Sequence, residues 1–161
     1  MNIRFNGNIV EIDDCRIIWR NFSGMEGNYP DPSNRGFAVV IPEQDLADEL
    51  MERGFNVTVR PPRNEDESPL YLLKVKFNYD RPGLEPGAYL YTGRNRRMLS
   101  EQTIGTLDKV DIQSVSLDVR KSEWSRGGRS GVTNYLQCIK VVQQIDRFAA
   151  EFEEEDMPFE G

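Results

Sequence analysis

A tryptophan and four cations share a glycine-rich segment late in the sequence. Residues 120–131 read Arg-Lys-Ser-Glu-Trp-Ser-Arg-Gly-Gly-Arg-Ser-Gly. Proteins that hold single-stranded nucleic acid combine cations for phosphates with exposed rings for bases, and each stacked base contributes about 1–3 kcal/mol. We therefore predict a flexible binding loop in which Trp124 stacks on bases. The alternative is that Trp124 folds back over the core. The cations of this loop are Arg120, Lys121, Arg126 and Arg129.

A second candidate segment runs from residue 15 to residue 22. Strand alternation places Arg16, Arg20 and Phe22 on one face and Trp19 on the other. We expect the first face to contact the ligand and Trp19 to lie in the core. An ordinary solvated face explains the same residues equally well.

A third candidate combines two lysines with an arginine cluster. Lys74 and Lys76 share the polar face of a strongly alternating segment. They would line a groove if the following segment, with its basic cluster, folds over the sheet. Cations on an exposed face are more often simply solvated. The cluster consists of Arg94, Arg96 and Arg97.

Several catalytic chemistries lack the residues that they need. The sequence contains no histidine, which excludes Ser-His and Cys-His nucleophiles and most zinc sites. Cys15 and Cys138 match no metal-binding spacing, and no phosphate-binding glycine-lysine loop is present. We expect no enzyme activity and no cofactor. A magnesium-dependent nuclease remains a minor alternative, with Asp13, Asp14, Asp108 and Asp111 as conceivable ligands.

The C-terminus joins a run of carboxylates to a short apolar segment. Residues 151–161 read Glu-Phe-Glu-Glu-Glu-Asp-Met-Pro-Phe-Glu-Gly, with six acids and no Lys or Arg. Such a run is expected to stay extended and solvated, and its Pro-Phe pair suits a basic-rimmed apolar pocket on another protein. A purely solubilising tail is the alternative.

This terminus resembles a known family. Glu-Glu-Glu-Asp-Met-Pro-Phe is similar to the acidic tip of bacterial single-stranded-DNA-binding proteins, where several acids lead into Asp-Ile-Pro-Phe. The resemblance covers about the final tenth of the chain. In that family Phe is the last residue and its carboxylate contacts partners, whereas Glu160 and Gly161 follow it here. The resemblance implies docking of replication or recombination proteins on Glu154, Glu155, Asp156, Met157, Pro158 and Phe159.

The charge distribution is compatible with a DNA partner despite the acidic total. The net charge is −7 over 161 residues. Without the six tail acids, residues 1–150 carry 21 acids against 20 cations, a net charge of −1. A polyanion responds to the local field, so a nearly neutral body can carry a basic groove. No apolar stretch approaches membrane-spanning length, and we expect a cytoplasmic protein with no membrane partner.

The elements that must position these residues are mostly strands. We expect a turn at Asp13-Asp14, a long loop over residues 21–35, one amphipathic helix over residues 42–54, and a loop over residues 121–132. The alternation of residues 71–79 assigns the odd positions to the core. The predicted strands cover residues 2–12, 15–22, 36–41, 55–60, 70–79, 89–91, 111–120 and 133–145.

These elements predict a mainly β fold, an OB-like Greek-key barrel with one short helix and extended loops. The composition fits a β-sandwich equally, and the resemblance favours the barrel. We expect residues 1–147 to form the DNA-binding domain and residues 148–161 to form an acidic partner-binding tail. The small, divergent body suits a bacteriophage version, located in the host cytoplasm. A homodimer through a barrel edge is one option.

The predicted function is sequence-tolerant binding of single-stranded DNA in replication, recombination or repair. The acidic tail would recruit partner proteins. The alternative from another class is an interaction adaptor or assembly factor that binds no DNA and uses the tail for solubility.

Overall fold

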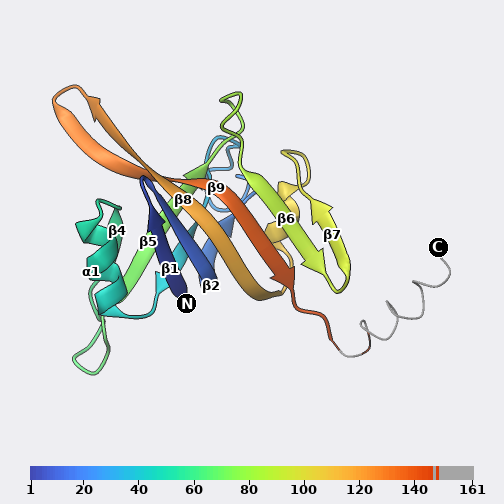
Figure 1. The fold of residues 1–161 in the computed structure, drawn as a ribbon, viewed down its shortest axis with the longest axis horizontal. Helices are drawn as coiled ribbons and strands as arrows, with labels where there is room; N and C mark the ends of the chain where they lie inside the picture. Colours follow the sequence, from blue (N-terminus) through green and yellow to red (C-terminus); the bar gives the residue numbers. More distant parts are fainter. Residues whose placement is uncertain (147, 149–161) are drawn as a thin grey trace.

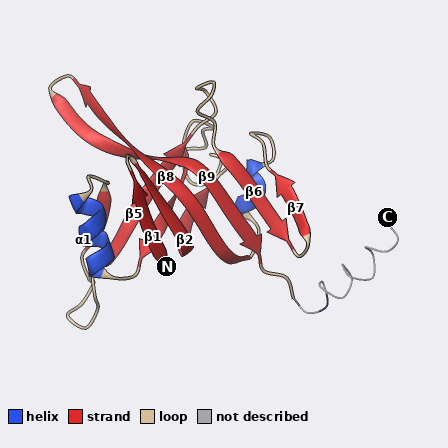
Figure 2. Ribbon diagram, in the orientation of Figure 1, coloured by secondary structure: helices blue, strands red, loops and turns tan. Residues whose placement is uncertain are grey.

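The computed structural model describes residues 1–146 and residue 148 (Figures 1 and 2). In this part of the chain, strands dominate and one α-helix forms. The strands are β1 (Asn2–Asn6), β2 (Ile9–Asn21), β3 (Arg35–Ile41), β4 (Val57–Arg60), β5 (Leu70–Phe77), β6 (Gly87–Thr92), β7 (Asn95–Met98), β8 (Ile112–Arg126) and β9 (Arg129–Gln143). The helices are α1 (Gln44–Glu52) and the short 3-10 helix η1 (Ile104–Asp108).

Five strands close into a barrel. The pairs β2–β3, β3–β5, β2–β8 and β8–β9 are antiparallel, and β5 meets β9 in parallel at Lys76 and Tyr135. This circuit has the OB-like Greek-key order, so the predicted fold class is confirmed. Strands β1 and β4 extend the barrel at its edges, and the β6–β7 hairpin is attached to β9.

The core follows the predicted alternation along β5. Leu73, Val75 and Phe77 are buried, while Lys74 and Lys76 on the opposite face are exposed. Helix α1 was also predicted correctly, and it packs its buried Ala47 and Leu50 into the same core. Burial of such apolar side chains is the main force that holds the barrel together.

The expected turn at Asp13-Asp14 is wrong, because β2 continues through it. The hairpin between β1 and β2 instead turns at Gly7 and Asn8, where Gly7 has a φ of 61°. Asp14 adopts a φ of 53° at a register shift between Ile12 and Cys15. A β-bulge thus occupies this position, and Asp tolerates the left-handed region better than most residues.

A second irregularity in β2 reverses two of the predicted side-chain positions. Trp19 has a φ of 55°, and the register with β3 shifts between Ile18 and Asn21. One extra residue in a strand moves all later side chains to the other face. Trp19 is therefore 50% exposed instead of buried, and Phe22 is 0% exposed instead of facing a ligand.

The loop expected over residues 121–132 is a continuation of β8 and β9. The two strands pair up to Arg126 and Arg129 and are joined by Gly127 and Gly128, which have φ angles of 59° and 79°. A two-residue turn with positive φ at both positions matches the twist of paired strands. The resulting ribbon projects from the barrel (Figure 1).

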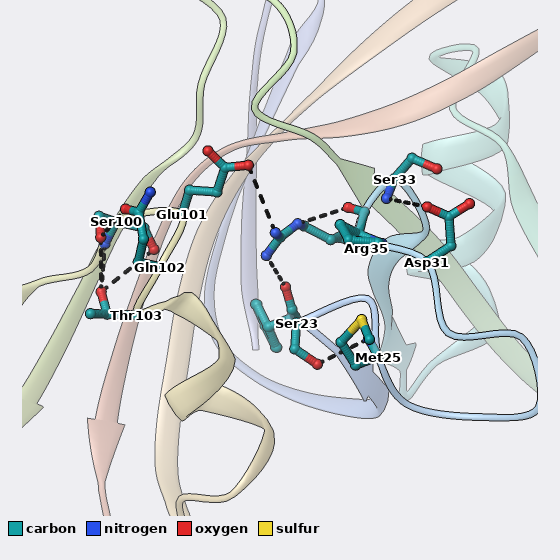
Figure 3. Close-up of polar contacts among 11 residues, drawn as sticks. Ser23, Met25, Asp31, Ser33, Arg35, Ser100, Glu101, Gln102 and Thr103 are labelled. Carbon is teal, nitrogen blue, oxygen red and sulfur yellow. Dashed lines mark hydrogen bonds and ion pairs between the residues drawn. The ribbon is translucent and has the colours of Figure 1, made fainter.

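Arg35 anchors the long loop between β2 and β3 (Figure 3). It is 8% exposed, and its Nη1 and Nε donate to the carbonyl oxygens of Phe22 and Pro32 at 2.8 and 2.9 Å. Its guanidinium also lies 5.3 Å from the ring centroid of Tyr79 and 4.0 Å from a carboxylate oxygen of Glu101. One buried cation thus fixes both ends of this loop.

A row of acids marks the outer face of β2 and β8. Glu11 pairs in register with Asp118 on β8, and Asp13 is two residues further along β2. Partial burial raises the pKa of Asp118, and the neighbouring carboxylates of Glu11 and Asp13 raise it further. We call Glu11, Asp13 and Asp118 the acidic row. Arg4 lies 3.6 Å from Glu11 and 3.7 Å from Asp13.

Replacing Arg35 tests the loop anchor. We expect Arg35→Met to lower the free energy of unfolding by about 2–4 kcal/mol, because the carbonyl oxygens of Phe22 and Pro32 lose a buried and a partly buried hydrogen bond. Urea denaturation measures the change. Glu101→Gln is the matched control, since its contact with Arg35 is long and half exposed, and it should cost less than about 1 kcal/mol. Equal effects of the two substitutions would show that the hydrogen bonds of Arg35 do not anchor the loop.

The raised pKa of Asp118 predicts that the stability of the protein depends on pH. Its folded pKa is raised, so folding favours the protonated carboxyl, and stability is lost as the pH rises through the folded pKa. Asp118→Asn removes this titration. The variant should gain stability relative to the natural protein as the pH rises above the ordinary range of Asp. Thermal unfolding at several pH values measures the difference, and parallel curves would contradict the expectation.

Candidate nucleic-acid interface

The β8–β9 ribbon gathers aromatic and cationic side chains on one face. Residues directly opposite each other in an antiparallel pair point to the same side. The register places Trp124 opposite Gly131 and Arg120 opposite Tyr135. At the tip, Arg126 lies opposite Arg129.

Trp124 lies against the ribbon without being covered. A Cβ atom added at Gly131 would come within 2.7 Å of Cζ2 of Trp124, so only glycine leaves room for the indole there. Trp124 is 45% exposed. The structure thus places this ring on the projecting ribbon and not over the core.

A groove lies between this face of the ribbon and β5. It has a volume of about 550 Å³, and we call it the hairpin groove. Arg120 adds a further cation at the inner end, with its guanidinium 5.4 Å from the ring centroid of Tyr135. The groove combines two aromatic rings with an excess of cations, as binding of single strands requires. Its lining includes Trp124, Tyr135, Lys76, Arg81, Arg126 and the single acid Glu123.

The tip of the ribbon carries a like-charge pair. Arg126 and Arg129 occupy directly opposite positions next to the two-glycine turn. Like charges at opposite positions of a strand pair are destabilising. A phosphate group between the two guanidinium groups would remove that repulsion.

The exposed Trp19 forms a second aromatic site on the outer face of the barrel. The Arg60 guanidinium and the Lys74 ammonium lie 5.3 and 5.8 Å from its ring centroid. We call Trp19, Arg60 and Lys74 the Trp19 cluster. A positive φ is unusual for a bulky residue and costs about 1–3 kcal/mol, and such strain is concentrated at functional sites.

The Trp19 cluster and the hairpin groove belong to one continuous face. Lys74 contacts the Trp19 ring, Lys76 lines the groove, and the two lysines are neighbours on the outer side of β5, about 7 Å apart. Opposite them on β3 lie the small residues Ala38 and Gly36. In OB-folds the face of the second and third barrel strands, with the adjoining loops, binds oligonucleotides.

Other predicted contact residues serve the fold instead. Phe22 is buried, and its ring stacks on Phe37 at 5.0 Å, so the expected ligand contact of Phe22 is wrong. Nη1 of Arg20 donates to the carbonyl oxygens of Leu107 and Val110 at 2.9 and 2.7 Å. That guanidinium therefore holds the segment around η1. Arg16 remains exposed on the outer face.

Lys121 lies on the opposite side of the ribbon from Trp124. Its ammonium lies 5.5 Å from the ring centroid of Phe55 and donates to the carbonyl oxygen of Arg53, at the C-terminal end of α1. A cation at this end of a helix is favourable because the last carbonyl groups carry negative partial charge. Lys121 thus attaches the base of the ribbon to the helix.

The arginine cluster does not share a groove with Lys74 and Lys76. Arg94 lies in the turn of the β6–β7 hairpin, and Arg96 and Arg97 lie on β7, at the other end of the molecule from β4 (Figure 1). Nη2 of Arg97 is 3.3 Å from the Thr106 hydroxyl. The expectation of one groove formed by these five cations is therefore wrong. The predicted partner-binding residues 154–159 lie outside the described residues.

The aspartates considered for a nuclease site do not converge. Both carboxylate oxygens of Asp108 accept backbone hydrogen bonds, from Phe22 at 2.7 Å and from Ser23 at 3.0 Å. Within residues 1–146 and 148, no three acidic, Cys or His side chains come together in a metal-binding arrangement. Burial raises the pKa of the Cys15 thiol to about 12, which makes it unreactive.

None of the helices within residues 1–146 and 148 is long and apolar enough to cross a membrane.

Three solved structures with a similar fold come from bacteriophage Enc34. The single-stranded DNA-binding protein from bacteriophage Enc34 is 8% identical, with a TM-score of 0.58 over 92% of this chain and 93% of that chain. The same protein in complex with ssDNA gives 11% identity and a TM-score of 0.55 over 88% and 89% of the two chains. Its C-terminal truncation gives 10% identity and a TM-score of 0.53 over 86% and 88%. At these identities the comparison shows a shared fold.

The family comparison covers nearly the whole sequence. No curated protein matches the chain. The model of one family, described as a putative phage ssDNA-binding domain, matches residues 2–160. Such proteins bind and do not catalyse, in agreement with the expectation that the chain is not an enzyme. The chain therefore belongs to the family of putative phage ssDNA-binding domains.

Proposed function

We propose that this protein binds single-stranded DNA, without sequence specificity, along the outer face of β3 and β5 and into the hairpin groove. The observation that carries the proposal is one continuous face with a half-exposed tryptophan at each end and cations between them. The family and the Enc34 protein solved with ssDNA support the same ligand.

On this face, the aromatic rings contact the bases and the cations contact the phosphates. Trp124 and Tyr135 in the groove, and Trp19 beyond Lys74, offer flat rings to any base, so binding tolerates every sequence. Lys76 and Arg126, together with the other cations of the groove, meet the phosphates and release counterions from the strand. The mechanism contains no bond-breaking step.

The biological setting follows from the same proposal. A protein that covers single strands without sequence preference serves phage DNA replication, recombination or repair in the host cytoplasm. The acidic segment at residues 148–161 would form a separate tail that recruits replication or recombination proteins through residues 154–159. A barrel-edge homodimer plays no part in this mechanism.

Loss of the groove tryptophan tests the stacking contact. We expect Trp124→Ala to weaken binding to a labelled oligothymidine by about 1–3 kcal/mol, roughly 5- to 150-fold, as measured by fluorescence anisotropy. The melting temperature should stay nearly unchanged, because the ring lies on the ribbon outside the core. A lower melting temperature with unchanged affinity would assign Trp124 a structural role.

The two tryptophans can be followed separately, because the sequence contains no others. Trp124→Phe leaves Trp19 as the only indole, and Trp19→Phe leaves Trp124. We expect oligothymidine to quench the emission of both single-tryptophan proteins and added salt to reverse the quenching. If oligothymidine quenched the emission of neither indole at any concentration, the result would favour the adaptor that binds no DNA.

The salt dependence of affinity identifies the phosphate contacts. We expect Lys76→Ala to reduce the slope of log K against log salt by about 0.7–1, the effect of losing one phosphate contact. Arg4→Ala is the control, because this exposed arginine pairs with Glu11 and Asp13 away from the groove. An equal reduction of the slope in both variants would exclude a specific contact of Lys76.

A further inference from the structure

A second set of aromatic and cationic side chains lies on the β6–β7 hairpin and the end of β9. In the register, Tyr89 lies opposite Met98 of β7 and beside Lys140 of β9, and Tyr91 lies opposite Arg96. Residues paired in this way point to the same side of the sheet. We call these five residues the β6–β7 patch.

The patch faces away from the core. Leu90, which lies between the two tyrosines, is 5% exposed, and its neighbour Val141 on β9 is 0% exposed, so the core lies on the other side of the sheet. On the patch side, Met98 is 71% exposed, and Arg96 and Lys140 are also exposed.

Rings and cations of the patch are in direct contact. The Lys140 ammonium lies 4.7 Å from the ring centroid of Tyr91. Tyr89 and Tyr91 are half-buried and stand two residues apart on one side of β6, about 7 Å from each other. Two rings spaced along a strand, with cations beside them, repeat the composition of the hairpin groove.

The acidic row keeps the patch apart from the hairpin groove. Along β8 and β9, the pair Asp118–Cys138 lies between the pair Arg120–Tyr135 of the groove and Lys140 of the patch. Asp118 is close enough to Glu11 and Asp13 for their charges to raise its pKa. Phosphates are repelled there, so a strand in the groove has no favourable path across β8 into the patch.

We propose that the β6–β7 patch is a second single-stranded-DNA site, so that one protein molecule holds two separate stretches of DNA at once. This inference rests on the proposed function of the groove and extends it. Arg96 and Lys140 bind phosphates, and Tyr89 and Tyr91 stack on bases. A protein with two such faces brings two strands, or two distant parts of one strand, close together.

Three variants separate the two sites. The patch variant carries Arg96→Gln and Lys140→Gln. The groove variant carries Trp124→Ala and Lys76→Gln. The matched control is Arg97→Gln, because Arg97 is the neighbour of Arg96 on β7 but pairs in register with the core-side Leu90. Thermal unfolding of each variant shows whether it is folded.

The assay mixes short oligothymidines that carry either a fluorescence donor or an acceptor. We expect the natural protein and the Arg97→Gln control to give energy transfer between the two oligonucleotides, with one protein per complex in sedimentation. The patch variant should lose the energy transfer, yet its tryptophan emission should be quenched with an affinity within about twofold of the natural protein. The groove variant should also lose the transfer.

The opposing outcomes are distinct. Energy transfer that persists in the patch variant, or that comes from complexes with two proteins, overturns the proposal. Quenching of the tryptophan emission of the natural protein without any energy transfer also overturns it, while the proposed function stands. If the natural protein shows neither quenching nor energy transfer, the proposed function is wrong as well. If the patch variant loses binding of a synthetic peptide of residues 151–161 but keeps energy transfer, the patch is a peptide site instead.

Discussion

The parallel contact between β5 and β9 is the constraint on which the rest of this structure depends. It joins Lys76 to Tyr135 and so closes the ring of five strands. Without it, β5 and the ribbon would belong to separate edges of an open sheet, with unpaired backbone groups on each. Because the closure brings these two residues together, the cations of β5 face the rings of the ribbon. The hairpin groove is thus a product of barrel closure.

Irregularities in β2 are equally decisive for the outer face. The bulge at Asp14 lets β2 pair with β1, β8 and β3 along its length. The bulge at Trp19 turns the indole ring outward. The same bulge sends Phe22 inward to stack on Phe37, beside the loop that Arg35 fixes. The strain at Trp19 is therefore coupled to a well-packed core residue three positions away, which holds it in place.

Sequence patterns predicted the structural features that depend on local periodicity. The alternation of β5, the position of α1 and the mainly β class were correct, because burial on one face imposes a period that can be read directly. The two bulges were not predictable, since nothing in Asp13-Asp14 or around Trp19 distinguishes an inserted residue from a turn or a regular strand. Tyr135 and Arg81 were missed because their places in the groove depend on contacts between segments that are far apart in the sequence. The two-glycine turn at Gly127-Gly128 was the one signal that could have shown the ribbon to be a hairpin.

The arginine pair at the tip of the ribbon would link local order to the proposed ligand. Arg126 and Arg129 face each other across a turn of two glycines, as the last pair of the β8–β9 ladder. The charges that repel each other at this end also attract a polyanion, so a phosphate bound at the proposed site would neutralise the repulsion. In the proposed complex, the nucleic acid would therefore stiffen the end of the ribbon.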